Sequence, residues 1–264
     1  MLEATLEGIG FWGNGLPDWD SACAWMRSGE RALDPPARPS PQLLAANERR
    51  RAPATVAVAL EAALAACHAA DRDPATLPSV FTSNHGELSI TDYMCATLAE
   101  DPYAISPTRF HNSVHNAAAG YWTIGAGTHA AATAISAGEH SFAQGLLEAL
   151  AQLHAGEPAV LLVAYDGSAT GPLADVSPSE GLLGAALVLS RSACAGLPTL
   201  KLRLHAQAPA ADLPQPDAGP LMQLYAANAM SPLLPLLQAL AMDQDTLWMP
   251  AGGEQWLEIG ISHE

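Results

Sequence analysis

The stretch of sequence that decides the fold is FHNSVHNAAAGYWTIGAGTHAAATAISAGEHSFAQGLLEALAQLHAGEPAVLLVAYD, residues 110–166. Its pattern predicts a helix over 112–125, a strand over 131–136, an amphipathic helix over 141–154 and an apolar strand over 158–165. The last segment, PAVLLVAY, lacks polar alternation, which is typical of a strand buried on both faces. Strand, helix and strand in this order indicate two parallel strands joined by a crossover helix.

Elements of the same kind are predicted on both sides of this unit. Residues 33–41 are rich in proline and are expected to be irregular, and Pro53 is expected to divide a short basic turn from a long helix. The first helix is expected to begin at a capping residue, Asp18 or Asp20. One α/β domain over 1–264 is predicted, with a mixed, mainly parallel sheet and helices on both faces. The other predicted strands are 2–10, 78–83, 184–190, 200–205 and 256–261, and the other predicted helices are 18–31, 47–70, 90–100 and 225–242.

The composition excludes several classes of protein. The chain has 264 residues with 27 Asp+Glu against 11 Lys+Arg, so its formal net charge is −16, and Lys201 is its only lysine. Nucleic-acid binding is not expected, because phosphate backbones are bound by clustered cationic side chains. A hydrophobic content of 49% with only 14% charged residues excludes a disordered chain.

Cysteine use and hydropathy predict where the protein resides. The four cysteines are scattered and form no C-x-x-C pair, which is typical of a reducing compartment. The first residues carry acids where a secretory signal would carry Lys or Arg. No run reaches the ~18 consecutive apolar residues that a membrane-spanning helix needs. A cytoplasmic protein without a membrane span is therefore expected.

Residues 107–120, PTRFHNSVHNAAAG, resemble the Pro-x-x-Phe-x-x-Ser-x-x-Asn-x-x-x-Gly segment of β-ketoacyl synthases, which have the thiolase fold. The resemblance covers most of residues 1–205. It includes Gly8-Ile9-Gly10 in the opening strand, the basic turn at 48–50, and the strand in EGLLGAALVLS at 180–190. It implies a thiolase-like fold of which this chain is the N-terminal half, truncated relative to full ketosynthases.

Two details are most similar to one group within that family. The run HGELS at 85–89 and Trp122 in AAAGYWTIG resemble the chain-length-factor-like subunits of aryl polyene pigment pathways. Residues 206–264 then form a divergent C-terminal extension of the same domain. A half-thiolase exposes the apolar face that the missing half would cover, so we expect poor solubility alone or an unusual cover from this extension.

The nucleophile of the family is absent. In β-ketoacyl synthases a cysteine at a strand-to-helix elbow accepts the acyl chain as a thioester, and the helix N-terminus lowers its pKa. Counting forward from Gly120 without gaps places Glu139 at that position, and a shorter register that matches TAISAG places Ile135 there. The ungapped register is preferred because it aligns Ser141 with the family's serine. Neither glutamate nor isoleucine can form a thioester.

The two histidines that assist decarboxylation in the family are also missing. After Ser190 only His205 and His263 occur, and neither lies in a motif of that kind. The resemblance therefore implies a non-enzymatic subunit that pairs with an active, full-length β-ketoacyl synthase, meets the acyl carrier protein only indirectly, and needs no cofactor. Two alternatives stay open: a malonyl-carrier-protein decarboxylase that uses Glu139, its pKa raised by burial, and a homodimeric regulatory or binding module.

The resemblance implies that the segment after Ser113 lies at the subunit interface and that residues of the elbow line or plug the vacated pocket. Trp122 and Phe142 are also explained by burial in the core. The candidate interface and tunnel residues are Asn112, Ser113, His115, Asn116, Trp122, Glu139, His140 and Phe142.

Other polar motifs favour ordinary explanations. The histidines 111, 115, 129 and 140 have spacings that fit no common zinc motif, so no metal site is expected. The run Arg49–Arg51 is interpreted as a solvated helix end in preference to a docking site for an acidic carrier protein. For His85-Gly86-Glu87, a functional role and a simple turn before a helix stay equally open.

Overall fold

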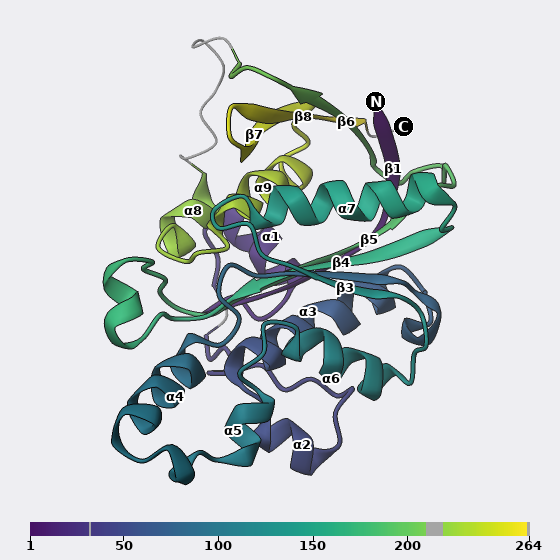
Figure 1. Cartoon of the computed structure of the whole chain (residues 1–264). Coiled ribbons are helices and arrows are strands. Elements are labelled where there is room, and N and C mark those ends of the chain that lie inside the picture. The colour runs from purple at the N-terminus through teal and green to yellow at the C-terminus, as the bar shows by residue number, and fades with distance from the viewer. Residues whose placement is uncertain (32, 210–218, 263–264) are drawn as a thin grey trace.

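The computed structural model describes residues 1–31, 33–209 and 219–262 (Figure 1). Within these residues, eight strands form one sheet in the order β3-β2-β4-β5-β1-β6-β8-β7. The strands are β1 (Leu2–Gly13), β2 (Ser79–Thr82), β3 (Ala132–Ile135), β4 (Ala159–Asp166), β5 (Leu183–Ser190), β6 (Thr199–His205), β7 (Thr246–Gly252) and β8 (Gln255–Ser262).

Helices cover both faces of the sheet. They are α1 (Trp19–Ser28), α2 (Ala46–Arg51), α3 (Ala54–Ala69), α4 (Leu88–Glu100), α5 (Pro107–His111), α6 (Ala117–Ala126), α7 (Ser141–Ala155), α8 (Pro220–Tyr225) and α9 (Leu234–Ala241). Short 3-10 turns stand at Pro74–Thr76, Pro102–Ala104, Gly171–Asp175 and Ser231–Leu233. In Figure 1, α3 and α6 lie below the sheet and α7 lies above it.

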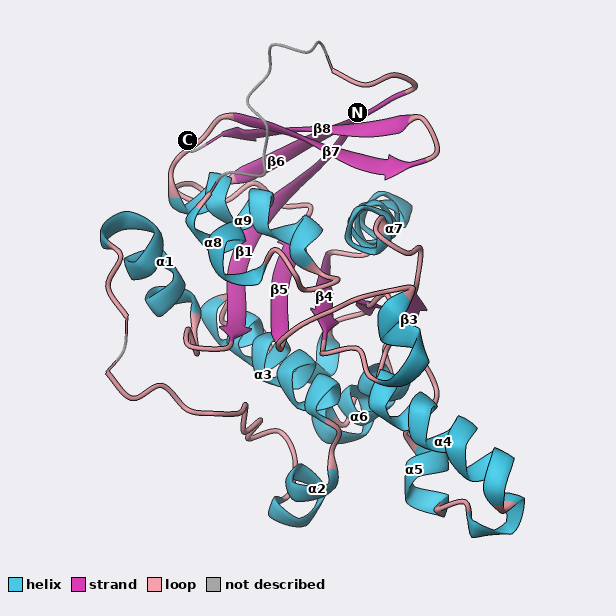
Figure 2. Cartoon of the chain, turned by 90° about the vertical axis from the view of Figure 1, so that its left-hand side faces the viewer, coloured by secondary structure: helices cyan, strands magenta, loops and turns pink. Residues whose placement is uncertain are grey.

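The long strand β1 joins two parts of the sheet. Its first residues pair with β6, the rest pairs with β5, and the register shifts between Leu6 and Gly8. Beyond β1, the strands β6, β8 and β7 turn over the upper face, so that α7 and α9 lie between the two parts of the sheet (Figure 2). One hydrophobic cluster fills this space, and a second lies between the sheet and the lower helices α3 and α6.

The sheet is mixed, as predicted, but the prediction that it is mainly parallel is wrong. Only β2 pairs in parallel, with β3 and with β4. The other pairings, β1–β5, β1–β6, β4–β5, β6–β8 and β7–β8, are all antiparallel. For two of these pairs the reason lies in the connection: a parallel neighbour needs a crossover helix, whereas β4 to β5 and β7 to β8 are linked without an α-helix.

Two predicted helices and one strand differ from the structure. The predicted helix over 112–125 begins later than expected, because residues 112–116 form a non-helical link between α5 and α6. The helix over 225–242 was expected to be interrupted or offset near Pro232 and Pro235, and it is offset: α8 ends at Tyr225, and α9 begins only after the 3-10 turn at Ser231–Leu233. Strand β7 was not predicted, since Pro250 argues against a strand; it fits because β7 is at the edge of the sheet.

The C-terminal residues cover the upper face of α7. Phe142, Leu146 and Leu150 of α7 belong to the same buried cluster as Leu237 of α9 and Ile259 of β8. Residues 219–262 therefore supply apolar side chains that pack on α7. Residues 210–218 and His263 lie outside the described residues.

The start of α1 tests the predicted cap. Asp18 is the N-cap: its carboxylate accepts from the Ser21 backbone N–H at 2.7 Å, and the Ser21 hydroxyl accepts from the Asp18 N–H at 3.2 Å. Asp18→Ala removes one side of this capping box and is expected to lower the free energy of unfolding by about 1 kcal/mol. Asp20→Ala, which removes an acid from the first turn but no cap, is the matched control. Equal losses in urea unfolding would contradict the assignment.

Candidate functional site: the β3–α7 elbow and the α6–β3 face

A tight turn joins β3 to α7 and forms the predicted elbow. The Ser141 hydroxyl donates to the Gly138 carbonyl at 2.7 Å and accepts from the Ala137 N–H at 2.9 Å, so one buried side chain closes the turn. Gly138 has φ +58°, in the left-handed region that glycine adopts without a steric penalty. The sequence Ser-Ala-Gly-Glu-His-Ser therefore makes a strand-turn-helix elbow whose exposed apex is Glu139.

The two candidate nucleophile positions lie in different parts of the elbow. Glu139 belongs to the turn, with its side chain 83% exposed and Oε1 3.6 Å from Nε2 of His140. Ile135 is the last residue of β3, half-buried and packed against the upper cluster. The elbow thus presents a solvated carboxylate and an imidazole, and Nδ1 of His140 is buried without a hydrogen-bond partner.

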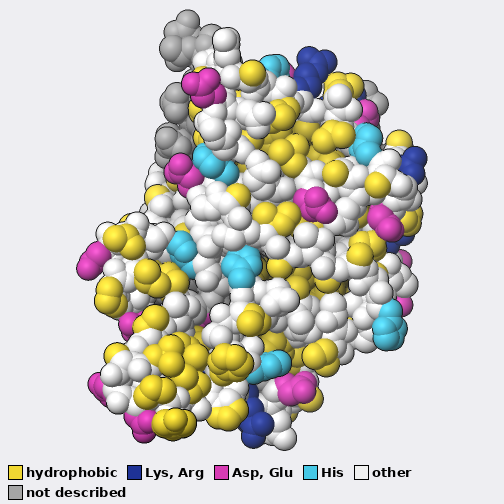
Figure 3. Space-filling view, in the orientation of Figure 1, with side chains coloured by type: hydrophobic (Ala, Val, Ile, Leu, Met, Phe, Trp, Pro, Cys, Tyr) yellow, Lys and Arg dark blue, Asp and Glu magenta, His cyan; other side chains and the backbone are white. Residues whose placement is uncertain are grey.

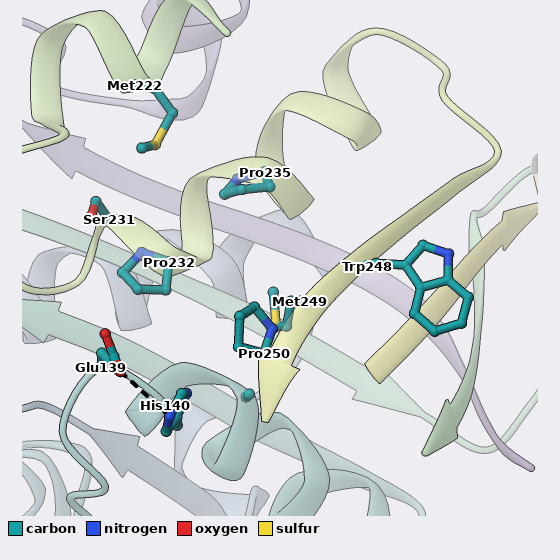
Figure 4. Close-up of a pocket in the computed structure, with 10 residues that line it drawn as sticks. Glu139, His140, Met222, Ser231, Pro232, Pro235, Trp248, Met249 and Pro250 are labelled. Carbon is teal, nitrogen blue, oxygen red and sulfur yellow. Dashed lines mark ion pairs between the residues drawn. The ribbon is translucent and has the colours of Figure 1, made fainter. Parts of the chain in front are cut away.

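A cavity of about 250 Å³ opens beside the elbow (Figure 4). Its far wall comes from the C-terminal segment, and most of its lining is apolar. The lining residues are Glu139, His140, Ala143, Met222, Ser231, Pro232, Pro235, Trp248, Met249 and Pro250. Residues after position 220 therefore supply most of the wall of this cavity.

No cysteine lies near this cavity. Cys23 is on α1, Cys95 is exposed on α4, and Cys194 is exposed in the loop between β5 and β6. Cys67 is buried in α3, where desolvation raises the pKa of its thiol to about 12. His205 is engaged elsewhere: its Nε2 lies 2.8 Å from Oε2 of Glu258, and its ring lies 4.6 Å from that of Trp248.

The link between α5 and α6 holds four of the predicted interface residues. Asn112 is buried, and its Oδ1 has no hydrogen-bond partner. The Ser113 hydroxyl donates to the Phe110 carbonyl at 2.8 Å. Nε2 of His115 donates to the Ser83 carbonyl at 2.8 Å, and Asn116 is exposed. The link is thus fixed to the protein on one side and open to solvent on the other.

Trp122 and Phe142 do not reach the surface. Trp122 is fully buried in the lower cluster, next to Phe81 with ring centroids 6.3 Å apart. Phe142 is buried in the upper cluster. Both are core residues in this chain, so any effect on a partner would pass through the helices that they anchor.

An uncharged surface surrounds the exposed side of this link. We call it the α6–β3 face and define it as Phe110, Val114, Asn116, Gly120, Ile124 and Ala132, all of which are exposed. β3 pairs with β2 on one side only, so its outer edge is free of strand partners within the described residues. In a chain of net charge −16, six neighbouring exposed residues without a charge mark this surface as distinct.

A groove of about 600 Å³ opens on the α6–β3 face. Phe110, Val114, Tyr121, Ile124 and Leu44 give it an apolar wall, and Arg51 and Glu48 lie at its rim. Apolar side chains continue over α4 and the 3-10 turn that follows it, where Leu98 and Tyr103 are also exposed (Figure 3). Exposed apolar surface of this kind marks a protein–protein contact or a ligand groove.

A buried polar cluster lies where β2 and β4 end, and the sequence analysis did not find it. Asp166 is 0% exposed and accepts from the Ser83 hydroxyl at 2.6 Å and the Asn84 N–H at 2.8 Å. Burial raises the pKa of the Asp166 carboxyl to about 6, although these hydrogen bonds act in the opposite direction. The available signal was that two adjacent parallel strands both end in polar residues, whose side chains then meet at one edge.

The remaining polar motifs take part in local structure. Nη2 of Arg49 donates to the Leu44 carbonyl at 2.9 Å, and Arg50 donates to Asn47. Glu87 accepts from the hydroxyl of Thr55 at 2.9 Å, which ties the β2–α4 turn to the start of α3. Within the described residues, no three His, Cys, Asp or Glu side chains come close enough together to hold a metal ion.

Comparisons with known proteins agree with this geometry. The mixed sheet with helices on both faces is a thiolase-like fold. Residues 22–257 match the β-ketoacyl synthase N-terminal domain, and the chain belongs to that family. Comparison with curated proteins finds no significant match.

In the part of the chain that the structure describes, no helix combines the length and apolarity needed to cross a membrane.

Solved structures share the fold at low sequence identity. The complex of the ketosynthase ApeO with its chain length factor ApeC from Xenorhabdus doucetiae matches with a TM-score of 0.75 and 24% identity, over 98% of this chain and 100% of that chain. The ishigamide ketosynthase/chain length factor matches with a TM-score of 0.72 and 14% identity, over 99% of both chains. A β-ketoacyl synthase from Burkholderia phymatum STM815 matches with a TM-score of 0.62 and 13% identity, over 93% of this chain but only 71% of that chain.

Proposed function

We propose that this chain is a non-catalytic, chain-length-factor-like subunit that pairs with a full-length β-ketoacyl synthase and shapes its acyl tunnel. The chemistry of the elbow carries the proposal. Condensation needs a thiolate there, and this turn presents Glu139 and His140 beside a cavity that no cysteine lines. A carboxylate at the apex cannot hold an acyl chain as a thioester.

The α6–β3 face supports the pairing. A free strand edge next to exposed apolar side chains is a liability in an isolated protein and is normally covered. A second subunit of the same fold would cover it. Two of the similar structures are, by their descriptions, a ketosynthase with its chain length factor, and this chain would take the second role.

The groove on that face supports a role in chain length. Its apolar wall, from Phe110 to Ile124, suits a hydrocarbon chain that grows in the partner and ends against this subunit. We infer a polyene as the chain, from the resemblance of the HGELS run to aryl polyene subunits. The acidic surface makes this subunit a poor dock for an acidic carrier protein, so the partner would supply that contact.

The alternative role of Glu139 as a decarboxylation base gains no support from its surroundings. That role requires a buried carboxyl, and the Glu139 side chain is 83% exposed. A homodimeric module would use the same α6–β3 face. The two hypotheses therefore differ in the partner that binds this face: a second copy of this chain or a ketosynthase.

Co-expression with the ketosynthase of the same gene cluster tests the proposal. We expect the two chains to co-purify in equal amounts and the complex to extend malonyl units. Recovery of this chain as a soluble homodimer that does not bind the ketosynthase would instead support the regulatory module.

Glu139→Gln tests whether the elbow is catalytic. We expect the condensation rate of the complex to stay within about twofold of wild type, because the carboxylate is solvated and forms no covalent bond. Radiolabelled acyl groups are expected on the partner and not on this chain. Labelled acyl groups on this chain, or loss of CO₂ release in the Glu139→Gln complex, would reject the non-catalytic assignment.

A further inference from the structure

A buried carboxylate fixes the turn between β2 and α4. Because β2 and β4 are parallel neighbours, Asp166 at the end of β4 meets the residues that follow β2. Its Oδ1 accepts from the Ser83 hydroxyl at 2.6 Å and from the His85 N–H at 3.4 Å, and its Oδ2 accepts from the Asn84 N–H at 2.8 Å. The Ser83 hydroxyl also accepts from the Gly86 N–H at 2.8 Å, so the whole turn is organised around one carboxylate.

The β2–α4 turn also holds the α5–α6 link, which reaches the α6–β3 face. The Ser83 carbonyl accepts from Nε2 of His115 at 2.8 Å, and a side chain added at Gly86 would lie 3.5 Å from the Cα of His115. The hydroxyl of Tyr165, the residue before Asp166, donates to the His115 carbonyl at 3.4 Å. The position of His115, and with it of Asn116, therefore depends on the residues that Asp166 orders.

We propose that Asp166 is a positioning residue: its ionised carboxylate holds the β2–α4 turn, and through His115 the α5–α6 link, in the form that the ketosynthase partner binds. Uptake of a proton by this carboxylate then weakens the complex. The inference rests on the proposed function, because it assigns a regulation to the partner-binding face.

The hydrogen-bond pattern gives the physical reason. The three groups that face Asp166 all donate, so they match a carboxylate and conflict with the O–H of the neutral acid. Burial is the largest influence on the pKa of Asp166 and raises it to about 6. The ionised form therefore predominates above pH 6, where we expect the tightest binding, and binding weakens as the pH falls through 6.

Other titratable groups lie near the Asp166 cluster. On the turn, Nε2 of His85 pairs with the Ser177 hydroxyl at 3.0 Å, and burial followed by the charge of His115 lowers its pKa. Burial and then the charge of Asp166 raise the pKa of Tyr165. Glu87 is held by Thr55, and from the C-terminal segment Asn228 donates to the Asp166 carbonyl at 3.4 Å.

The test is the affinity of the purified chain for its full-length ketosynthase between pH 7.5 and pH 5. For wild type we expect binding about tenfold weaker at pH 5 than at pH 7.5. Asp166→Asn mimics the neutral acid, so its affinity at pH 7.5 is expected to be as low as that of wild type at pH 5, with little further change. Any pH dependence of binding that the Asp166→Asn variant keeps is attributed to the histidines or to the partner. Glu7→Gln, which removes a carboxylate of β1 that is paired with Arg72, is expected to keep the wild-type profile.

A second variant guards against a simple loss of structure. Ser83→Ala removes a hydrogen bond that lowers the pKa of Asp166 but keeps the carboxylate, so the midpoint of the binding profile should move to higher pH. A purely structural weakening would leave the midpoint in place. The inference is overturned if wild type binds with a flat profile, or if Asp166→Asn binds like wild type at pH 7.5. Absence of binding at every pH would reject the proposed function itself.

Discussion

Ile124→Arg is expected to abolish co-purification of this chain with its ketosynthase partner. Ile124 lies on α6 with its side chain 75% exposed, at the centre of the uncharged α6–β3 face. If the partner covers this face, the guanidinium must lose its hydration there, which costs several kcal/mol. The expected change is a loss of affinity of at least ~100-fold, measured by co-purification and by titration of the separate subunits.

The matched control is Leu204→Arg. Leu204 is 51% exposed on β6, in the part of the sheet that lies over α7 and not at the α6–β3 face. The Leu204→Arg substitution adds the same charge to a site that we expect to stay in solvent, so binding should be unchanged. Wild-type affinity for Ile124→Arg, or equal losses for the two variants, would place the interface elsewhere. Circular dichroism should report folded protein in both cases, since neither side chain is in the core.

Much of the fold could be predicted because its local patterns are strong. After its first residue, the run PAVLLVAY belongs to β4, which is buried along its whole length, and Pro53 does separate α2 from α3. The direction of the strands could not be predicted in the same way. β5 lies between β4 and β1 and is antiparallel to both, and nothing in its own residues states which neighbours it has. Such pairings depend on contacts between distant segments, which the sequence pattern does not encode locally.

The candidate site shows the same contrast between features set by local sequence and features set by distant contacts. The elbow could be located because a whole family shares its spacing, and its Gly-Glu-His turn needs no distant contact. The Asp166 cluster joins residues 83 positions apart, and in the sequence the aspartate looks like a polar strand end. The α5–α6 link was predicted as helix because its small residues suit one. Asn112 ends α5 instead, and His115 is drawn away by the Ser83 carbonyl.

Gly10→Ala is expected to destabilise the chain by about 3 kcal/mol or more, since it forces apart two elements that pack without a gap. A methyl group at this position would lie 1.9 Å from the Ala62 carbonyl oxygen and 2.7 Å from the Ala66 nitrogen. These are backbone atoms of α3, so no side chain can rotate to make room. The helix must shift on β1, which disturbs the lower cluster. Equilibrium unfolding in urea measures the change.

Gly120→Ala provides the opposite case within the same protein. Gly120 is in the middle of α6, nothing lies within 4 Å of the added methyl group, and alanine favours the helix. It should therefore raise the free energy of unfolding by about 0.5–1 kcal/mol. If both variants changed stability in the same direction, the close contact of β1 with α3 could not be the cause. Opposite signs would show that the backbone of α3, which packs directly on β1, requires a glycine at position 10, and would explain why the Gly-Ile-Gly run stands at this point of the chain.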